Sequence, residues 1–230
     1  MAAPLVLLPG LICDARIFAG QLAYFDAQAI DGFGARSTLR AMAEHVLAAA
    51  PPRMSLLGHS MGARVALEVF RAAPERVERI ALVSTGTHPT RPGEAEKRFA
   101  LRDLGRTKGA EALVDQWLPP MVAPERLKDE ILMSGLRRMC VEAGVDAFEA
   151  QIRALLDRPE VESLLPGLDR PTLVAVGSLD IWSPPLQHEA IAAAVPDAIY
   201  RVVEGAGHML PAEAPEALNA AIAEWLARPA

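Results

Sequence analysis

The sequence predicts an α/β protein whose single, mainly parallel sheet of about six strands is flanked by helices. Two observations favour this fold class. Short apolar runs alternate with helical patterns near both ends of the chain, which is typical of parallel strands joined by right-handed crossovers. The chain has 230 residues, of which 51% are hydrophobic, so it is long enough to bury one sizeable core.

The first part of the chain contains four expected strands. They are short, mostly apolar runs bounded by turn residues, at positions 5–8, 27–30, 54–57 and 77–83. One or two helical turns are expected at 21–25. A longer helix should begin after Ser37 or Thr38, either of which can cap it, and should end before Pro51. Another helix should follow residue 62 and end near Pro74.

The strand pattern is interrupted in the middle of the chain. Between residues 88 and 167 we find only helical stretches, at about 94–104, 110–117, 124–140, 145–156 and 160–164. The alternation then resumes with strands at 172–176 and 199–203 and helices at 184–195 and 215–226. We therefore expect a core made of residues 1–87 and 168–230, and a helical cap, residues 88–167, over the carboxyl ends of the strands.

Composition narrows the class of protein. The net charge of −6, with both signs interspersed, offers no basic surface for nucleic acid. Cys13 and Cys140 are too few for a disulfide framework and have no metal-binding spacing, so we expect free thiols and no metal. The N-terminus lacks the basic segment of a signal peptide, and no apolar stretch reaches the ~18–20 residues of a membrane helix. We expect a soluble cytoplasmic protein that does not bind membranes.

The most informative stretch is Gly58-His-Ser-Met-Gly62, between an expected strand and an expected helix. A serine in a strand–turn–helix setting of this kind forms a nucleophile elbow. The chain must reverse so sharply that a Cβ atom at either flanking position would crowd the turn. The turn exposes the Ser60 hydroxyl at a helix N-terminus, where developing negative charge is favoured. The simpler interpretation is a serine that only caps the helix.

A serine nucleophile needs a base, and the base needs an acceptor that holds its tautomer. Asp180 follows the strand at 172–176, and His208 follows the strand at 199–203. Since the carboxyl ends of parallel strands meet at one edge of a sheet, we expect Ser60, Asp180 and His208 to form a triad there. Asp180 could instead cap the next helix.

Other residues compete for these roles. His88 also follows a strand and is the rival base, although it precedes the acid in the chain. Glu204 is a rival acid, but it lies at the same strand end as His208. The oxyanion hole should use two backbone N–H groups, from Met61 and from the loop after the first strand. In that loop Leu11 is the preferred donor and Ile12 the second choice, because Pro9 has no N–H.

These motifs, in this order, resemble those of the α/β-hydrolase superfamily over essentially the whole chain, and the cap region is similar to the small-cap esterase and enol-lactonase branch. Two departures stand out. Pro9-Gly10 replaces the His-Gly usual at the oxyanion loop, and the antiparallel hairpin that normally starts the sheet has no counterpart. A missing hairpin would leave a sheet edge that something must cover, so we expect a monomer or a homodimer.

The resemblance implies hydrolysis of a carboxylic ester, lactone or thioester through an acyl-enzyme, without a cofactor. A serine at the nucleophile position argues against haloalkane dehalogenases and epoxide hydrolases, which use aspartate. C–C bond hydrolysis and lyase chemistry on the same triad remain open, as does a non-catalytic receptor for a small molecule, since fold alone does not fix function.

The substrate is expected to be small and largely apolar. We expect the pocket to be walled by residues near the triad and on the cap: Ile12, Trp117, Met121, Ile181, Trp182 and Met209. Three arginines of the cap, Arg137, Arg138 and Arg153, would bind a substrate carboxylate if they faced the pocket; solvated helix faces are the favoured interpretation.

Overall fold

The computed structural model describes residues 3–229 and contains one six-stranded sheet with the order β2-β1-β3-β4-β5-β6. All neighbouring strands pair in parallel. The strands are β1 (Leu5–Leu8), β2 (Ala27–Ala29), β3 (Met54–His59), β4 (Val77–Val83), β5 (Thr172–Gly177) and β6 (Ile199–Val203). The predicted parallel α/β fold is therefore confirmed.

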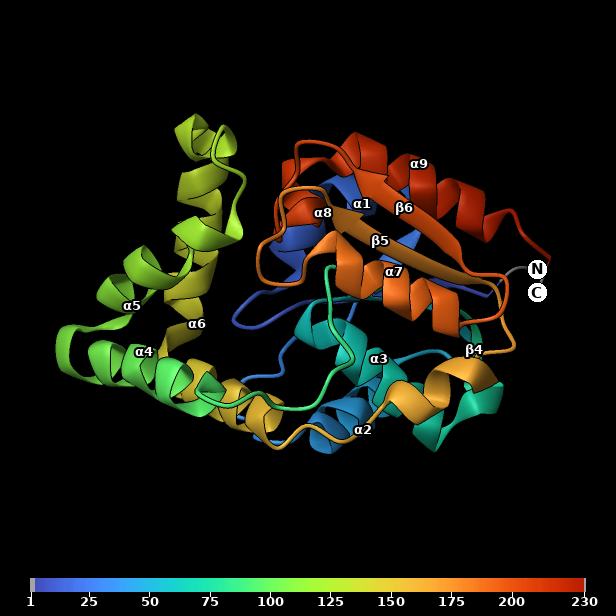
Figure 1. The fold of residues 1–230 in the computed structure, drawn as a ribbon, viewed down its shortest axis with the longest axis horizontal. Helices are drawn as coiled ribbons and strands as arrows, with labels where there is room; N and C mark the ends of the chain where they lie inside the picture. The colour runs from blue at the N-terminus through green and yellow to red at the C-terminus, as the bar shows by residue number, and fades with distance from the viewer. Residues whose placement is uncertain (1–2, 230) are drawn as a thin grey trace.

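Helices cover both faces of the sheet (Figure 1). One face packs against α1 (Ala19–Tyr24) and α9 (Pro215–Leu226), which also contact each other. The other carries α2 (Leu39–Ala49), α3 (Met61–Ala72) and α7 (Pro185–Ala194). Because both faces are covered, every residue of β1, β3 and β5 is buried, which explains why these strands read as continuous apolar runs.

The sheet edges are short or exposed. β2 has three residues of intermediate or high exposure, and β6 exposes Arg201 and Val202. The described residues contain no antiparallel strand, so β2 forms the edge of the sheet next to β1.

The two cysteines, Cys13 and Cys140, are free thiols.

The segment between β4 and β5 contains only helices, as expected. Its main elements are α4 (Glu94–Lys108), α5 (Ala110–Trp117) and α6 (Glu130–Leu156), followed by a 3₁₀ segment at Glu162–Gly167. They stand beside the end of the sheet from which β3, β5 and β6 lead into the loops described below (Figure 1). No helix within residues 3–229 is both long enough and apolar enough to span a bilayer.

The expected helix over 124–140 is wrong in its start. Residues Arg126–Lys128 form one 3₁₀ turn instead, and α6 begins at Glu130 because the Asp129 side chain caps it by accepting the Leu132 N–H at 3.0 Å. α6 runs to Leu156 but is kinked at Gly144, whose φ of 81° and ψ of 170° are not helical. The two helices predicted on either side of residue 144 are thus joined through this glycine.

The N-cap residue of α2, Thr38, gives a testable prediction about the fold. Thr38 Oγ1 accepts the Ala41 N–H at 3.1 Å, so Thr38→Ala should lower the free energy of unfolding by about 1 kcal/mol through loss of this cap. Chemical denaturation measures the change. Thr107→Ala is the matched control, since the Thr107 hydroxyl bonds only carbonyls inside α4 and caps nothing. Equal effects of the two substitutions would contradict the assignment.

Candidate active site

Ser60 sits in the left-handed region, with φ 54° and ψ −115°, between β3 and α3. The turn tolerates only glycine at its two flanks. A Cβ on Gly58 would collide with the backbone of Gly62 and Ala63, and one on Gly62 would collide with the carbonyl of Leu8. The serine backbone is held from the neighbouring strand as well, because its N–H donates to the Val83 carbonyl at 2.8 Å.

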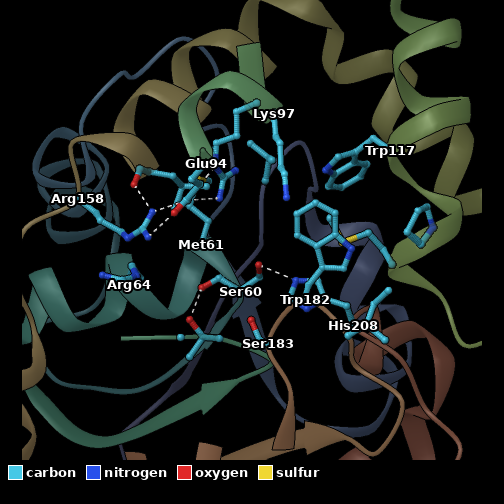
Figure 2. A pocket seen from close by; sticks show the side chains of 18 of the residues that line it. Ser60, Met61, Arg64, Glu94, Lys97, Trp117, Arg158, Trp182, Ser183 and His208 are labelled. Carbon is cyan, nitrogen blue, oxygen red and sulfur yellow. Dashed lines mark hydrogen bonds and ion pairs between the residues drawn. The ribbon is translucent and has the colours of Figure 1, made fainter. Parts of the chain in front are cut away.

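The three predicted side chains form one hydrogen-bonded chain, part of which Figure 2 shows. His208 Nε2 lies 2.9 Å from Ser60 Oγ, and His208 Nδ1 lies 2.8 Å from Asp180 Oδ2. With Nδ1 donating to the carboxylate, Nε2 is left as the acceptor for the serine proton. Asp180 is also the local cap that the sequence allowed, because its Oδ1 accepts the N–H groups of Trp182 and Ser183, at 2.9 and 2.8 Å.

The charge of Asp180 is stabilised despite its position. Its side chain is buried, which opposes ionisation, but the facing His208 and the Ser183 N–H outweigh burial and hold the pKa of the carboxyl below its usual value. Asp180 therefore stays an anion at neutral pH and can stabilise an imidazolium on His208.

The loops that carry the acid and the base are packed against each other. A Cβ on Gly177, at the end of β5, would collide with the carbonyls of Ala206 and Gly207, so glycine lets the two loops approach. The Leu179 N–H donates to the Ala206 carbonyl at 2.9 Å and closes the contact.

The backbone N–H groups of Leu11 and Met61 are the expected oxyanion donors, and both residues lie near Ser60. Met61 is the first residue of α3, so its N–H has no acceptor within the helix. Gly10 brings the loop after β1 against the nucleophile, since a Cβ there would lie 3.2 Å from Ser60 Cβ. Leu11 and Met61 both line the cavity around Ser60. The second choice, Ile12, is unsuitable because its N–H donates to Gln151 Oε1 at 2.7 Å.

The cavity has a volume of about 510 Å³ and contains Ser60 and His208 (Figure 2). Trp117, Met121 and Met209 are buried in its wall, while Ile181 and Trp182 are 71% and 41% exposed. The expectation that Ile12 lines this pocket is wrong: its side chain packs in the hydrophobic core and is only 2% exposed.

The rival residues do not contact the Ser60 hydroxyl. His88 lines the cavity, but its Nδ1 lies 2.8 Å from the Pro89 carbonyl and it makes no hydrogen bond to Ser60. Glu204 is exposed beyond the end of β6. His59 is buried and its Nε2 lies 2.8 Å from the His208 carbonyl; burial, and then the nearby His208, lower its pKa to about 3, so it remains neutral.

Sequence reasoning missed the residues that attach the cap to the site. Glu213 Oε2 accepts the N–H groups of Ala123 and Gly207, at 2.8 and 3.0 Å, and the Met121 carbonyl accepts the His208 N–H at 2.8 Å. Gln151 Oε1, on α6, accepts the Ile12 N–H at 2.7 Å. These residues belong to no sequence motif. The one signal that could have indicated them is a polar residue on an otherwise apolar helix face.

A sequence model described as "Alpha/beta hydrolase family" matches residues 5–221, so the chain belongs to this family and the resemblance found in its motifs is confirmed. The sn-1-specific diacylglycerol lipase ABHD11 of Mus musculus is 24% identical over 182 residues. That match covers 75% of this chain and 58% of the mouse protein, so the chain spans less than two thirds of this relative's length.

Solved structures agree over nearly the full chain. A thermophilic esterase from Thermogutta terrifontis is 27% identical with a TM-score of 0.85, covering 98% of this chain and 90% of that one. The enol-lactonase from Burkholderia xenovorans LB400 is 22% identical with a TM-score of 0.86, covering 99% and 93%. The second likeness establishes the fold alone.

The buried Glu213 gives a pH-dependent prediction. Burial raises the pKa of this carboxyl above its usual value of 4.5, although the bound N–H groups oppose the shift. Ionising Glu213 therefore costs more in the folded than in the unfolded chain, and its contribution to stability falls as pH rises through the folded pKa. Glu213→Gln cannot ionise, so its free energy of unfolding relative to wild type should increase as pH rises above 4.5.

Urea denaturation at a series of pH values measures this difference. Glu189→Gln removes one negative charge from the exposed face of α7 and is the control. Its change in the free energy of unfolding at each pH is subtracted from that of Glu213→Gln. A Glu213→Gln difference that is flat with pH after this correction would contradict the buried carboxylate described here.

Proposed function

We propose that the protein is a serine hydrolase that cleaves a carboxylic ester, lactone or thioester of a small substrate through an acyl-enzyme. The observation that carries the proposal is the unbroken chain from Ser60 Oγ through His208 to Asp180 at the floor of a cavity large enough for a small ester. The relatives agree with it, since one is named a lipase and another an esterase.

The first half-reaction follows from the geometry. His208 Nε2 takes the proton of Ser60 as its oxygen attacks the acyl carbonyl, and Asp180 stabilises the resulting imidazolium. The carbonyl oxygen becomes an oxyanion, which the N–H groups of Leu11 and Met61 would bind. When the tetrahedral intermediate collapses, His208 returns the proton to the leaving alcohol and the acyl group remains on Ser60.

The second half-reaction repeats these roles with water. His208 removes a proton from water, the hydroxide attacks the acyl-enzyme, and the oxyanion forms in the same place. Collapse breaks the bond to Ser60, which regains its proton from His208, and the carboxylic acid leaves. Each oxyanion donor contributes on the order of 10²–10³ in rate in enzymes of this type.

Substitution of the triad tests the proposal. With p-nitrophenyl butyrate as substrate, Ser60→Ala and His208→Ala should each lower kcat/KM by about 10³-fold or more. The double variant should lose little beyond either single one, because the two groups act as a unit. Ser134→Ala, exposed on α6, is the control and should keep wild-type activity.

The outcomes separate the alternatives. Activity that survives Ser60→Ala would overturn the acyl-enzyme mechanism. A folded wild type without activity on esters, thioesters or lactones would overturn the proposed reaction and favour C–C bond cleavage or ligand binding without turnover.

A further inference from the structure

The cavity around Ser60 has a cationic side that the proposed mechanism does not use. Apart from histidines, the charged residues that line it are one acid, Glu94, and five cations: Arg64, Arg91, Lys97, Arg98 and Arg158. Figure 2 shows the two sides of the cavity: Arg64, Arg158 and Glu94 lie to the left of Ser60, and Trp117 and Trp182 lie to the right. The cavity is thus charged on one side and aromatic on the other.

The single acid is already neutralised by the protein. Glu94 makes a two-pronged ion pair with Arg158, with N–O distances of 2.6 and 2.8 Å, and a further pair with Arg98 at 3.0 Å. Burial opposes its ionisation, but these arginines lower its pKa to about 2. Both oxygens of Glu94 are therefore paired with Arg158 and Arg98 and not with the remaining cations.

Arg64 is a buried cation that forms no ion pair with Glu94, although this acid is near enough to favour its charge. It is 4% exposed, and its Nη2 donates to the His88 carbonyl at 2.6 Å. Its Nη1 is buried and has no hydrogen-bond partner within residues 3–229. Burial, and then repulsion from Arg158, lower the pKa of this guanidinium to about 9, although the nearby Glu94 and Glu162 oppose the shift. A buried charge with an unpaired N–H group is costly, so an anion bound from outside would stabilise it.

The position of Arg64 relates this charge to the nucleophile. Arg64 lies on α3 four residues after Ser60, which is roughly 6 Å along a helix axis. Lys97 extends from α4 toward the space above Ser60 and adds a second positive charge (Figure 2). Because Arg64, Lys97 and Ser60 line one cavity, one small molecule can place an anionic group beside Arg64 and its carbonyl at Ser60.

We propose that the substrate is an ester that carries a carboxylate, bound by Arg64 on the cationic side of the cavity, with its apolar part against Trp117 and Trp182. This proposal deepens the proposed ester hydrolysis and rests on it. The three cap arginines considered from the sequence do not line this cavity: Arg137 pairs with Asp115, Arg153 pairs with Glu149, and Arg138 is exposed.

Substrate discrimination is the first test. Monomethyl adipate carries the carboxylate, whereas methyl hexanoate and dimethyl adipate are neutral esters of similar size; the acetate ester of 4-hydroxybutanoate places the carboxylate on the alcohol side. The wild type should prefer at least one acidic ester over the neutral ones by about tenfold to hundredfold in kcat/KM, as expected for a charge-assisted hydrogen bond. In Arg64→Met this ratio should fall to near one, and in Arg64→Lys it should be intermediate. Arg138→Met is the matched control and should keep the wild-type ratio.

A binding measurement separates failure of this proposal from failure of the proposed reaction. Monomethyl adipate is titrated into Ser60→Ala while the fluorescence of the cavity tryptophans is followed, with methyl hexanoate as the neutral comparison. The acidic ester should bind at least tenfold more tightly, and adding Arg64→Met should abolish the difference.

Equal affinity for both esters in Ser60→Ala, or a preference that survives Arg64→Met, would overturn the anion site even if esters are hydrolysed. A preference that is present without turnover would support the site and overturn only the reaction. If Arg64→Met does not fold, an Arg64→Lys ratio equal to wild type, or no preference in the wild type, overturns the site.

Discussion

The close approach of two backbones at Gly62 is the constraint on which the rest of the site depends. Because Gly62 has no side chain, α3 packs directly against the Leu8 carbonyl at the end of β1. Ser60, in the same turn, has a left-handed φ, which costs on the order of 1–3 kcal/mol and exists only where the surroundings impose it. Thr85 Oγ1 donates to the Ser60 carbonyl at 2.9 Å and adds to that restraint. The result is a hydroxyl at a helix N-terminus, within reach of His208.

The helical segment between β4 and β5 lines the cavity and also forms hydrogen bonds to two of the loops around Ser60. On one side, the stretch at 121–123 binds the loop that carries His208, through the Met121 carbonyl and Glu213. At the second loop, Gln151 accepts the N–H of Ile12, next to Leu11, which lines the cavity. A shift of the cap relative to the sheet would therefore move both the base and one proposed oxyanion donor.

The fold and the three central residues could be predicted because each is encoded locally. The bounds of β1, β4 and β6 follow from apolar runs, and Ser60, Asp180 and His208 each follow a strand in a turn rich in glycine. The start of α6 could not be predicted this way, because Pro124 and Asp129 are both acceptable helix beginnings and only the cap geometry chooses between them. Gln151, Glu213 and Arg64 were missed because their roles come from partners far away in the chain.

The central claim is that Ser60 is the nucleophile of this cavity, and covalent labelling tests it most directly. The protein is incubated with an alkyl phosphonofluoridate, whose phosphorus accepts an activated serine and stops at a tetrahedral adduct, and is then analysed by intact mass and peptide mapping. The account predicts one adduct per chain, on Ser60, that forms far more slowly in Asp180→Asn, where the imidazole loses its ionised partner. An adduct on another residue, or none on a folded wild type, would contradict it.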